Sequence, residues 1–322
     1  MKIASIDRPE FLERSAKPSR LDRLARRIVR GRLAALQYGE VTLVENGSEE
    51  TFGRATDEFP LEAALRIHDP AFYSDVAFGG SLGSGEAYIH GAWECGDLTS
   101  LVRILLKNRR VLDNMDSGAA LLTRPLGKIF HWFNRNTRSG SRRNISAHYD
   151  LGNDFYSLWL DDQMMYSSAF FEKSDTPLET AAIAKLDRIC DKLRLCPDDR
   201  VIEIGTGWGG FAIHAAKHYG CHVTTTTISD QQHEYANARI VAEGLQDKVT
   251  LLKNDYRDLD GTYDKLVSIE MIEAVGHEFL DTFFAKCASL LRPQGEMLLQ
   301  SITIADQRYD SARKNVDFIK RY

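Results

Sequence analysis

Four glycines within six residues, preceded by an acid, form the chemically most informative pattern of this 322-residue sequence. The glycines are Gly205, Gly207, Gly209 and Gly210. An apolar run precedes them and a helical pattern begins at Phe211, which predicts a strand, a tight loop and a helix start. Backbone N–H groups of such a loop can bind a ligand directly, because no side chain holds it away. The acid, Glu203, would repel a pyrophosphate but would accept a cofactor that carries a sulfonium charge and an amino group.

The segments expected after this loop alternate between strand and helix. Strands are expected at residues 222–228, 249–252, 265–269 and 296–304, and helices at residues 211–219, 229–243 and 278–291. This order predicts an α/β fold, with a mostly parallel, Rossmann-like sheet and helices on both faces. Ligands of such sheets bind beyond the carboxyl ends of the strands. Residues 205–210, 227–232, 255–256 and 270–273 should therefore surround one crevice.

Two helices are expected ahead of the loop. Residues 153–160 have a helical pattern with an aromatic face. The run Thr176-Pro177-Leu178-Glu179 combines an N-cap residue, a proline and a glutamate in the pattern of a capping box. A helix should begin at this run and end near Leu193.

The N-terminal part is expected to form a smaller α+β domain at residues 1–133. Short alternating runs, divided by Asn46-Gly47 and Gly79-Gly80, predict a small mixed sheet within residues 41–89, and an apolar helix is expected at residues 98–106. Residues 134–144 are basic and lack apolar anchors, so we expect a linker there. The larger domain then extends over residues 145–322.

Residues 19–37 predict a basic amphipathic helix. Leu21, Leu24, Ile28 and Leu36 share one side, and arginines occupy most of the rest. A helix of this kind can lie on anionic lipid, or it can simply cover one side of a small domain. The sequence leaves both alternatives open.

Composition limits the classes of function. The net charge of −5 argues against general nucleic-acid binding. Five cysteines occur without a C-x-x-C pair, so neither a disulfide framework nor a metal site is indicated, and a reducing cytoplasm fits best. No uninterrupted apolar run approaches ~20 residues, so no membrane-spanning helix is expected.

Several motifs together resemble those of the cyclopropane-fatty-acid synthase family, which includes the mycolic-acid methyltransferases. They lie at residues 147–156, 165–171, 203–210, 227–232 and 269–278. The resemblance covers nearly all of residues 145–322 and extends more loosely over residues 78–93. It implies a methyltransferase that uses S-adenosylmethionine to modify the cis double bond of an unsaturated phospholipid acyl chain. The expected product is a cyclopropane or a methyl- or methylene-branched chain. The expected location is cytoplasmic and peripheral at the inner membrane surface, and a homodimer stays open.

The expected cofactor-binding residues come from the glycine motif and from this resemblance. They are Tyr166, Ser167, Glu203, Gly205, Gly207, Gly209, Thr227, Ile228, Gln232, Asp255 and Tyr256. The resemblance places Gln232 at the ribose, and Asp255 and Tyr256 near the adenine. Glu203 could instead be an exposed charge at a strand end, and Asp255 could form an Asx turn.

The expected catalytic residues are Glu273, Ser168 and Gln300. The resemblance implies a bound bicarbonate as the base, held partly by Glu273, with Glu270 as a neighbouring acid. Either acid could instead pair with a surface cation. Family members commonly have cysteine at the position of Ser168 and histidine at that of Gln300. Since glutamine cannot titrate, these differences weigh against bicarbonate and ring closure and favour a methyl- or methylene-branched product.

Family members continue beyond the position of Tyr322, and their sheet ends in an antiparallel hairpin. We therefore expect a truncated methyltransferase domain that leaves strand 296–304 as an unprotected edge. Two other functions stay open: a small-molecule methyltransferase, which a narrow polar pocket would favour, and a non-catalytic lipid-surface binding protein, which would not bind S-adenosylmethionine.

Overall fold

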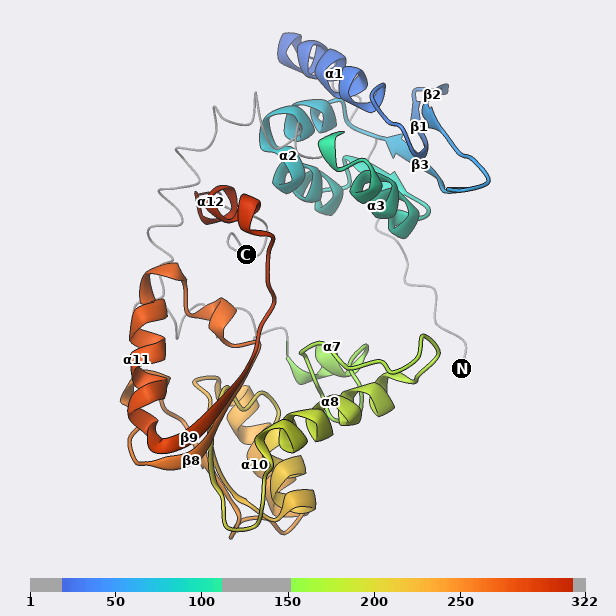
Figure 1. The fold of residues 1–322 in the computed structure, drawn as a ribbon. Coiled ribbons are helices and arrows are strands. Elements are labelled where there is room, and N and C mark those ends of the chain that lie inside the picture. The colour runs from blue at the N-terminus through green and yellow to red at the C-terminus, as the bar shows by residue number, and fades with distance from the viewer. Residues whose placement is uncertain (1–18, 112–151, 315–322) are drawn as a thin grey trace. The chain divides into compact units, whose positions relative to one another are not determined.

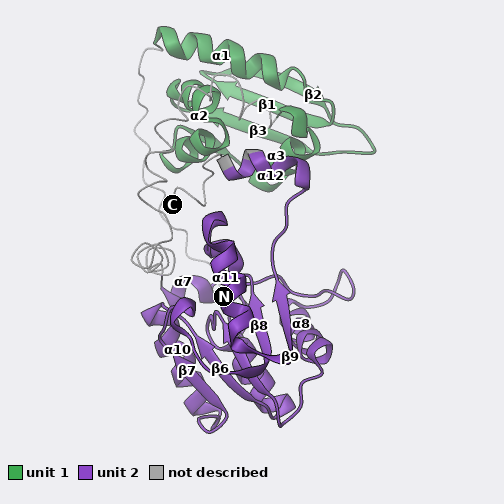
Figure 2. Ribbon diagram, turned by 60° about the vertical axis from the view of Figure 1, so that its left-hand side comes forward, with its two compact units in different colours: residues 1–132, 314–322 green, residues 133–313 purple. Residues whose placement is uncertain are grey.

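The computed structural model describes residues 19–111 and 152–314 (Figure 1). The chain divides into two compact units: residues 1–132 with 314–322, and residues 133–313 (Figure 2). The expected linker at residues 134–144 and the motif residues 147–151 lie outside the described residues.

The first unit contains a four-stranded mixed sheet in the order β2-β1-β3-β4. Its strands are β1 (Gly39–Glu45), β2 (Ser48–Arg54), β3 (Glu62–Ile67) and β4 (Trp93–Cys95). β1 pairs antiparallel with β2 and parallel with β3, and β4 pairs antiparallel with β3. Asn46 and Gly47 have φ angles of 50° and 76°, which allow the tight turn between β1 and β2. The mixed sheet predicted within residues 41–89 is therefore present, but it is shorter than expected.

Residues 71–89 form a helix rather than further sheet, which corrects the prediction. This helix, α2 (Ala71–Ile89), is kinked at Gly80, where φ is 61°. The Gly79-Gly80 pair, read from the sequence as a turn, therefore lies inside a bent helix. The bend brings two helical segments together, since a Cβ on Gly83 would lie 2.2 Å from the carbonyl oxygen of Asp75.

Two more helices complete the first unit. α3 (Leu98–Lys107) begins after Asp97, whose side chain accepts a hydrogen bond from the Ser100 N–H. α1 (Arg20–Leu33) begins at Ser19, which forms a capping box with Asp22. α1 lies against α2.

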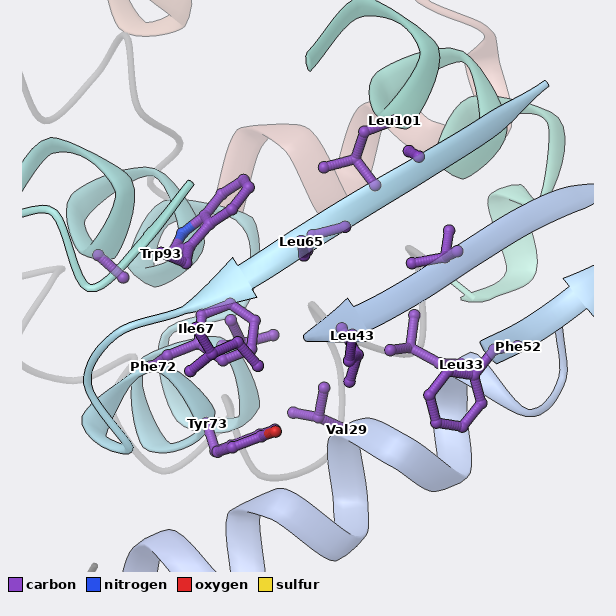
Figure 3. Close-up of a cluster of buried hydrophobic side chains, with 14 of the residues drawn as sticks. Val29, Leu33, Leu43, Phe52, Leu65, Ile67, Phe72, Tyr73, Trp93 and Leu101 are labelled. Carbon is purple, nitrogen blue, oxygen red and sulfur yellow. The ribbon is translucent and has the colours of Figure 1, made fainter. Parts of the chain in front are cut away.

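The buried face of α1 differs from the predicted one. Ala25, Val29 and Leu33 point into the core, whereas Leu21 and Leu24 are 53% and 52% exposed. The core on this side is formed by aliphatic and aromatic side chains from α1, α2 and the sheet (Figure 3). The small Ala25 and branched Val29 let α1 approach the other elements closely, which the larger leucines would prevent. Of the apolar side predicted from the sequence, Leu21 and Leu24 thus face outward, whereas Leu36 is buried and Ile28 packs against the core.

The second unit contains five parallel strands in the order β7-β6-β5-β8-β9. They are β5 (Arg200–Ile204), β6 (His222–Thr226), β7 (Val249–Leu252), β8 (Tyr263–Ile269) and β9 (Leu291–Gln300). β9 begins and ends earlier than the expected strand at 296–304. Within the described residues, β7 and β9 are the two edge strands.

Helices cover both faces of this sheet, as predicted (Figure 1). Val201 of β5 packs in a core with α8 (Leu178–Leu193), α9 (Gly210–His214) and α10 (Asp230–Ala242). Its neighbours Ile202 and Ile204 pack in the opposite core with α11 (Leu280–Leu290). This alternation follows from the period of two residues in a strand. Glu203 therefore shares the face of Val201, on the side of α8.

Short helical segments complete the second unit. They are α7 (Asn153–Ser157), the π-helix η2 (Ala215–Tyr219), the 3-10 helices η3 (Tyr256–Asp258), η4 (Ile272–Ala274) and η5 (His277–Phe279), and α12 (Asp306–Lys314).

The capping box expected at residues 176–179 is wrong. α8 begins at Leu178 with Pro177 at its N-cap and no side-chain cap hydrogen bond. The Thr176 hydroxyl instead accepts a hydrogen bond from the Lys173 N–H in the preceding loop. The expected end of this helix at Leu193 is correct.

Candidate functional site

The glycine loop connects β5 to α9 at the carboxyl end of the sheet. The N–H groups of Gly205 and Thr206 donate to the carbonyl oxygen of Thr226, at 3.2 and 2.9 Å, and so attach the loop to the end of β6. Gly207 has a φ of 52°, and no heavy atom lies within 4 Å of the position that its Cβ would occupy. The loop is thus held in place and leaves open space beside Gly207.

Two buried polar atoms near this loop have no hydrogen-bond partner among the residues that the structure describes: Thr206 Oγ1 and Asp161 Oδ2. Asp161 begins the segment that packs on the loop, since a Cβ on Gly210 would lie 2.5 Å from Met165 Sδ. Unpaired buried polar atoms are costly, and a ligand can complete them. The open space and the Thr206 hydroxyl fit a cofactor that presents a carboxylate to the loop, as S-adenosylmethionine does.

Arg239 of α10 joins this segment to the loop. Its Nη1 donates to the carbonyl oxygens of Gln163 and Trp208, both at 3.1 Å, and its Nη2 donates to Gln163 Oε1 at 2.6 Å. Arg239 could not be predicted from the sequence as a site residue, because nothing in the pattern of α10 distinguishes it from a solvated arginine. Its contacts hold Gln163 next to Trp208 of the glycine loop.

Tyr166 belongs to an aromatic cluster at the same place. Its ring centroid lies 5.4 Å from that of Tyr156 and 5.5 Å from that of Trp159. Tyr156 and Trp208 are buried, and Trp208 Nε1 donates to Asn153 Oδ1 at 2.7 Å. The aromatic faces predicted for residues 153–160 thus surround Tyr166, which is 43% exposed. Aromatic faces attract cations, so the cluster suits a positively charged ligand.

Glu203 is not the exposed strand-end charge that the sequence left open as an alternative. Its side chain is 2% exposed, and Oε2 accepts a hydrogen bond from Thr225 Oγ1 at 2.6 Å. Burial raises the pKa of this carboxyl to about 8, although Thr225 and the charge of Lys185 lower it. A direct contact between Glu203 and a cofactor stays a prediction.

The residues after β6 form one hydrogen-bonded group. Thr227 Oγ1 donates to Gln232 Oε1 at 2.8 Å, and the Ser229 N–H donates to Thr227 Oγ1 at 3.1 Å. Ser229 also caps α10 by accepting from the Gln232 N–H. The structure therefore brings the predicted Thr227, Ile228 and Gln232 to the strand end next to the glycine loop. A contact of Gln232 with a ribose stays a prediction.

Asp255 has the local role that the sequence offered as an alternative. It caps η3 by accepting from the Arg257 N–H, and both of its carboxylate oxygens accept from the Arg257 side chain, at 2.8 and 2.6 Å. Tyr256 packs edge-on against Phe283, with ring centroids 5.5 Å apart. Proximity of Asp255 and Tyr256 to an adenine is not tested by these contacts.

Three segments meet at the carboxylate of Glu270, which directly follows β8. Its Oε1 accepts from the Ser168 N–H and from Ser168 Oγ, both at 3.0 Å, and from Gln300 Nε2 at 2.8 Å. The adjacent Met271 side chain lies 3.1 Å from the position of a Cβ on Gly205. Ser168 and Gln300, predicted from separate motifs, are thus brought together beside the glycine loop.

Glu273 lies apart from this carboxylate. Its side chain is exposed, and Oε1 accepts from the Ile302 N–H at 2.5 Å, beyond the end of β9. No hydrogen bond among the described residues joins Glu273 to Ser168 or Gln300. The catalytic role expected of Glu273 stays a prediction.

Comparison with known proteins places this geometry in a family. The sequence profile named "Mycolic acid cyclopropane synthetase" matches residues 136–322. The chain belongs to this family. It is similar to a tuberculostearic acid methyltransferase, UfaA1, of Mycobacterium tuberculosis, with 36% identity over 82% of this chain and 63% of that protein. It is also similar to the cyclopropane-fatty-acyl-phospholipid synthase of Escherichia coli strain K12, with 40% identity over 74% of this chain and 61% of that protein.

Solved structures show the same family fold. The cyclopropane synthase MmaA2 from Mycobacterium tuberculosis has a TM-score of 0.50 and 32% identity, over 55% of this chain and 62% of that chain. The mycolic acid cyclopropane synthase CmaA1, complexed with SAH and CTAB, has a TM-score of 0.50 and 34% identity, over 53% of this chain and 60% of that chain. The second unit is therefore a Rossmann-like methyltransferase fold. The chain spans about three fifths of the length of the curated relatives named above.

The bicarbonate that the family resemblance implied does not fit the place beside Ser168 and Gln300 in this chain. The donors available for such an anion, the backbone and hydroxyl of Ser168 and the amide of Gln300, already hold the Glu270 carboxylate. A second anion at this place would meet a like charge. From the sequence, Glu270 was expected only to be an acid that neighbours Glu273. Its φ of 47°, which brings the side chain back to Ser168, is not visible in a sequence.

Lys185 is another residue of this site that was not predicted from the sequence. It is 4% exposed on the buried face of α8, and its Nζ donates to Ser167 Oγ at 2.5 Å. The spacing could have revealed it, because Ala182, Lys185 and Ile189 fall on one helical face.

No group of three or more His, Cys, Asp or Glu side chains in residues 19–111 and 152–314 could hold a metal ion. In the same parts of the chain, every helix is too short or too polar to cross a membrane.

Proposed function

We propose that this chain belongs to an S-adenosylmethionine-dependent C-methyltransferase that modifies the cis double bond of unsaturated phospholipid acyl chains. Family membership and the acyl-chain substrates named for its relatives support this function. The observation that carries it is the convergence of Ser168 and Gln300 on one carboxylate oxygen of Glu270 beside the glycine loop.

The cofactor would be held by the ends of β5 and β6. The open space at Gly207 and the Thr206 hydroxyl would receive its amino-acid part, and the Thr227–Gln232 pair would receive its ribose. The aromatic ring of Tyr166 would face its positive charge. When bound, S-adenosylmethionine supplies an electrophilic methyl group.

The protein's own contribution to the reaction is orientation and removal of a proton. An isolated alkene is a weak nucleophile, so holding it against the methyl donor is the largest available gain, about 7–11 kcal/mol for well-oriented groups. If the alkene took this methyl group, one C–C bond would form as the bond between the methyl carbon and sulfur breaks, and a carbocation would be left on the acyl chain. Loss of one proton from the chain to the Glu270 carboxylate then restores a neutral product with one added CH2 group. A positioned base of this kind typically contributes about 10²–10⁴-fold.

Ser168 and Gln300 fix the position of this base but do not replace it. Both donate hydrogen bonds to the same Glu270 oxygen, and the Gln300 amide cannot titrate. A carboxylate held by three hydrogen bonds reaches only the C–H bonds beside it. The proton that is lost decides the product, so a cyclopropane and a methylene-branched chain both fall within this proposal.

The test uses purified protein, S-adenosylmethionine and vesicles of a cis-monounsaturated phospholipid. We expect S-adenosylhomocysteine to form and each modified acyl chain to gain the mass of one CH2 group. Proton NMR of the released fatty acids separates ring protons from an exocyclic methylene group. The proposal fails if the wild-type protein adds no mass to any acyl chain.

The role of Glu270 is tested with Glu270→Gln, which keeps the shape and a hydrogen-bond acceptor. We expect turnover to fall by about 10²–10⁴-fold while the affinity for S-adenosylmethionine changes by less than about threefold. Glu273→Gln separates the two acids, and the exposed Glu179→Gln on α8 is the matched control. Normal turnover of Glu270→Gln together with an inactive Glu273→Gln would assign the base to Glu273.

We further propose that the outward face of α1 contacts the anionic membrane surface. Leu21 and Leu24 are more than half exposed, and exposed Arg20, Arg23 and Arg27 lie beside them on the helix. Partly inserted leucines gain hydrophobic free energy, and each arginine near an anionic surface contributes about 1 kcal/mol. Binding of this helix to anionic lipid is one of the two alternatives that the sequence left open.

Vesicle sedimentation tests this contact. The double variant Leu21→Ser with Leu24→Ser should bind anionic vesicles at least about tenfold more weakly than wild type. Leu158→Ser, which replaces an 80% exposed leucine of the second unit, serves as the control. Equal binding by wild type and the double variant would remove α1 from the proposal.

A further inference from the structure

A buried lysine lies directly behind the segment that carries Tyr166 and Ser167. Lys185 is 4% exposed, in the middle of α8. A buried ammonium group is costly unless it is paired or hydrogen-bonded. Its hydrogen bond is to a neutral hydroxyl, Ser167 Oγ, at 2.5 Å. The acids that act on it through space are Glu270, Asp161 and Glu203.

The chemistry of this bond fixes its direction. An ammonium group has only donors, so the Ser167 oxygen must be the acceptor. The hydrogen of the Ser167 hydroxyl therefore points away from Lys185 and is available to donate elsewhere. Charge on the lysine also makes this hydroxyl a stronger donor, because hydrogen bonds in a chain polarise one another.

Ser167 belongs to the segment that packs on the glycine loop, where the carboxylate of the proposed cofactor would bind. Met165, two residues earlier, contacts Gly210 of the glycine loop, and Arg239 holds residue 163 to the carbonyl oxygen of Trp208 in that loop. Ser167 itself is only half-buried. An outward-pointing donor at this position suits an anionic group of the ligand.

We propose that Lys185 is a positioning residue that holds the Ser167 hydroxyl as a donor to the carboxylate of S-adenosylmethionine. This inference rests on the proposed function, because it takes that cofactor as the ligand. Lys185 acts through Ser167 and does not itself contact the cofactor. The same lysine could instead serve only to offset the buried acids, and the two roles differ in which ligand group they affect.

Calorimetry at about pH 7 with two ligands distinguishes these roles. S-adenosylmethionine carries the carboxylate, and decarboxylated S-adenosylmethionine lacks it. We expect Lys185→Met to weaken binding of S-adenosylmethionine by about tenfold to a hundredfold, the range for a hydrogen bond to a charged group. Its affinity for the decarboxylated compound should change by less than about threefold.

Ser167→Ala should show the same selectivity, and it keeps the inference testable if Lys185→Met does not fold. The double variant should bind no more weakly than Ser167→Ala alone, because both changes remove one contact. The control is Lys192→Met, an exposed lysine at the end of the same helix, which should leave both affinities unchanged.

Each outcome decides a different point. If wild type binds neither compound, the proposed function fails, and this inference fails with it. If wild type binds S-adenosylmethionine and Lys185→Met binds it equally well, only the inference fails. If Lys185→Met weakens both ligands by the same factor, the lysine supports the fold and does not orient Ser167.

Discussion

Replacement Glu203→Gln tests whether the acid of the glycine motif is neutral at the end of β5. The carboxyl accepts a hydrogen bond from Thr225, and a glutamine oxygen can accept the same bond. A protonated carboxyl and an amide also have nearly the same size. If Glu203 is protonated in the folded protein, the variant should be stable and should lose only the pH dependence that Glu203 creates.

The magnitude follows from the raised pKa. Burial raises the pKa of Glu203 from 4.5 to about 8. Between these values the unfolded carboxyl ionises while the folded one keeps its proton, so the folded state binds more protons and stability falls as the pH rises. The contribution is fully present below about pH 4.5 and is lost by about pH 8. At about 1.4 kcal/mol per pH unit, the whole window corresponds to about 5 kcal/mol.

The assay is urea unfolding at several pH values, followed by tryptophan fluorescence, to which the buried Trp208 of the second unit contributes. The free energy of unfolding of wild type should decrease between about pH 5 and pH 8 relative to that of Glu203→Gln. Glu243→Gln is the control, since this exposed acid pairs with Lys217 and its pKa is lowered. The opposite trend, with wild type gaining stability as the pH rises, would mean that an ion pair with Lys185 outweighs burial and would refute the reasoning.

Two further predictions concern other parts of the chain. Asn108→Ala should destabilise the first unit by about 2–4 kcal/mol in thermal unfolding. The buried Asn108 amide forms hydrogen bonds with the backbone of Gln37, Tyr38 and Ile104, and the variant would leave these groups unpaired. A loss below about 1 kcal/mol would show that water replaces the amide. Gly207→Ala should fold, with a loss of stability of about 1–2 kcal/mol for its left-handed backbone. In calorimetry it should bind S-adenosylmethionine at least about tenfold more weakly, since the added methyl group enters the open space. Unchanged affinity would show that the cofactor does not use this space.

The parallel sheet could be predicted because each element of the second unit has a clear period in the sequence. β7 was predicted with the bounds that the structure shows, and β5, β6 and β8 within a few residues. The strand expected at residues 296–304 was misplaced, since Arg292, Pro293 and Gly295 in the first half of β9 are not typical of a strand. Pairing with β8, including an irregularity between Tyr263 and Lys265, keeps these residues in the strand.

The first unit was harder to predict, because its helices use small residues. Gly79 and Gly80 have the composition of a turn, yet the chain continues as helix through the kink at Gly80. On α1 the larger leucines suggested the buried side, but Ala25 and Val29 form it. In both cases close packing of neighbouring elements decided the result, and a periodic pattern does not contain that information.

The site shows the same division between local pattern and tertiary contact. The glycine loop and the Thr227–Gln232 pair follow directly from strand ends, so the sequence placed them correctly at one edge of the sheet. The role of Glu270 depends on its meeting with Ser168, about a hundred positions earlier in the chain. Similarly, Lys185 is recognisable as unusual only when the buried face of α8 is known.

Backbone strain occurs on two segments of this site. Met164 and Glu270 are two of four described non-glycine residues with positive φ, at 54° and 47°. Left-handed backbone costs about 1–2 kcal/mol for such residues and persists only where contacts enforce it. Met164 is buried just before Tyr166, and the Glu270 N–H donates to the carbonyl oxygen of Gln300 at 2.8 Å. The strained residues thus lie on the two segments that the Ser168–Glu270 contact joins, and this contact keeps a carboxylate in place beside the glycine loop.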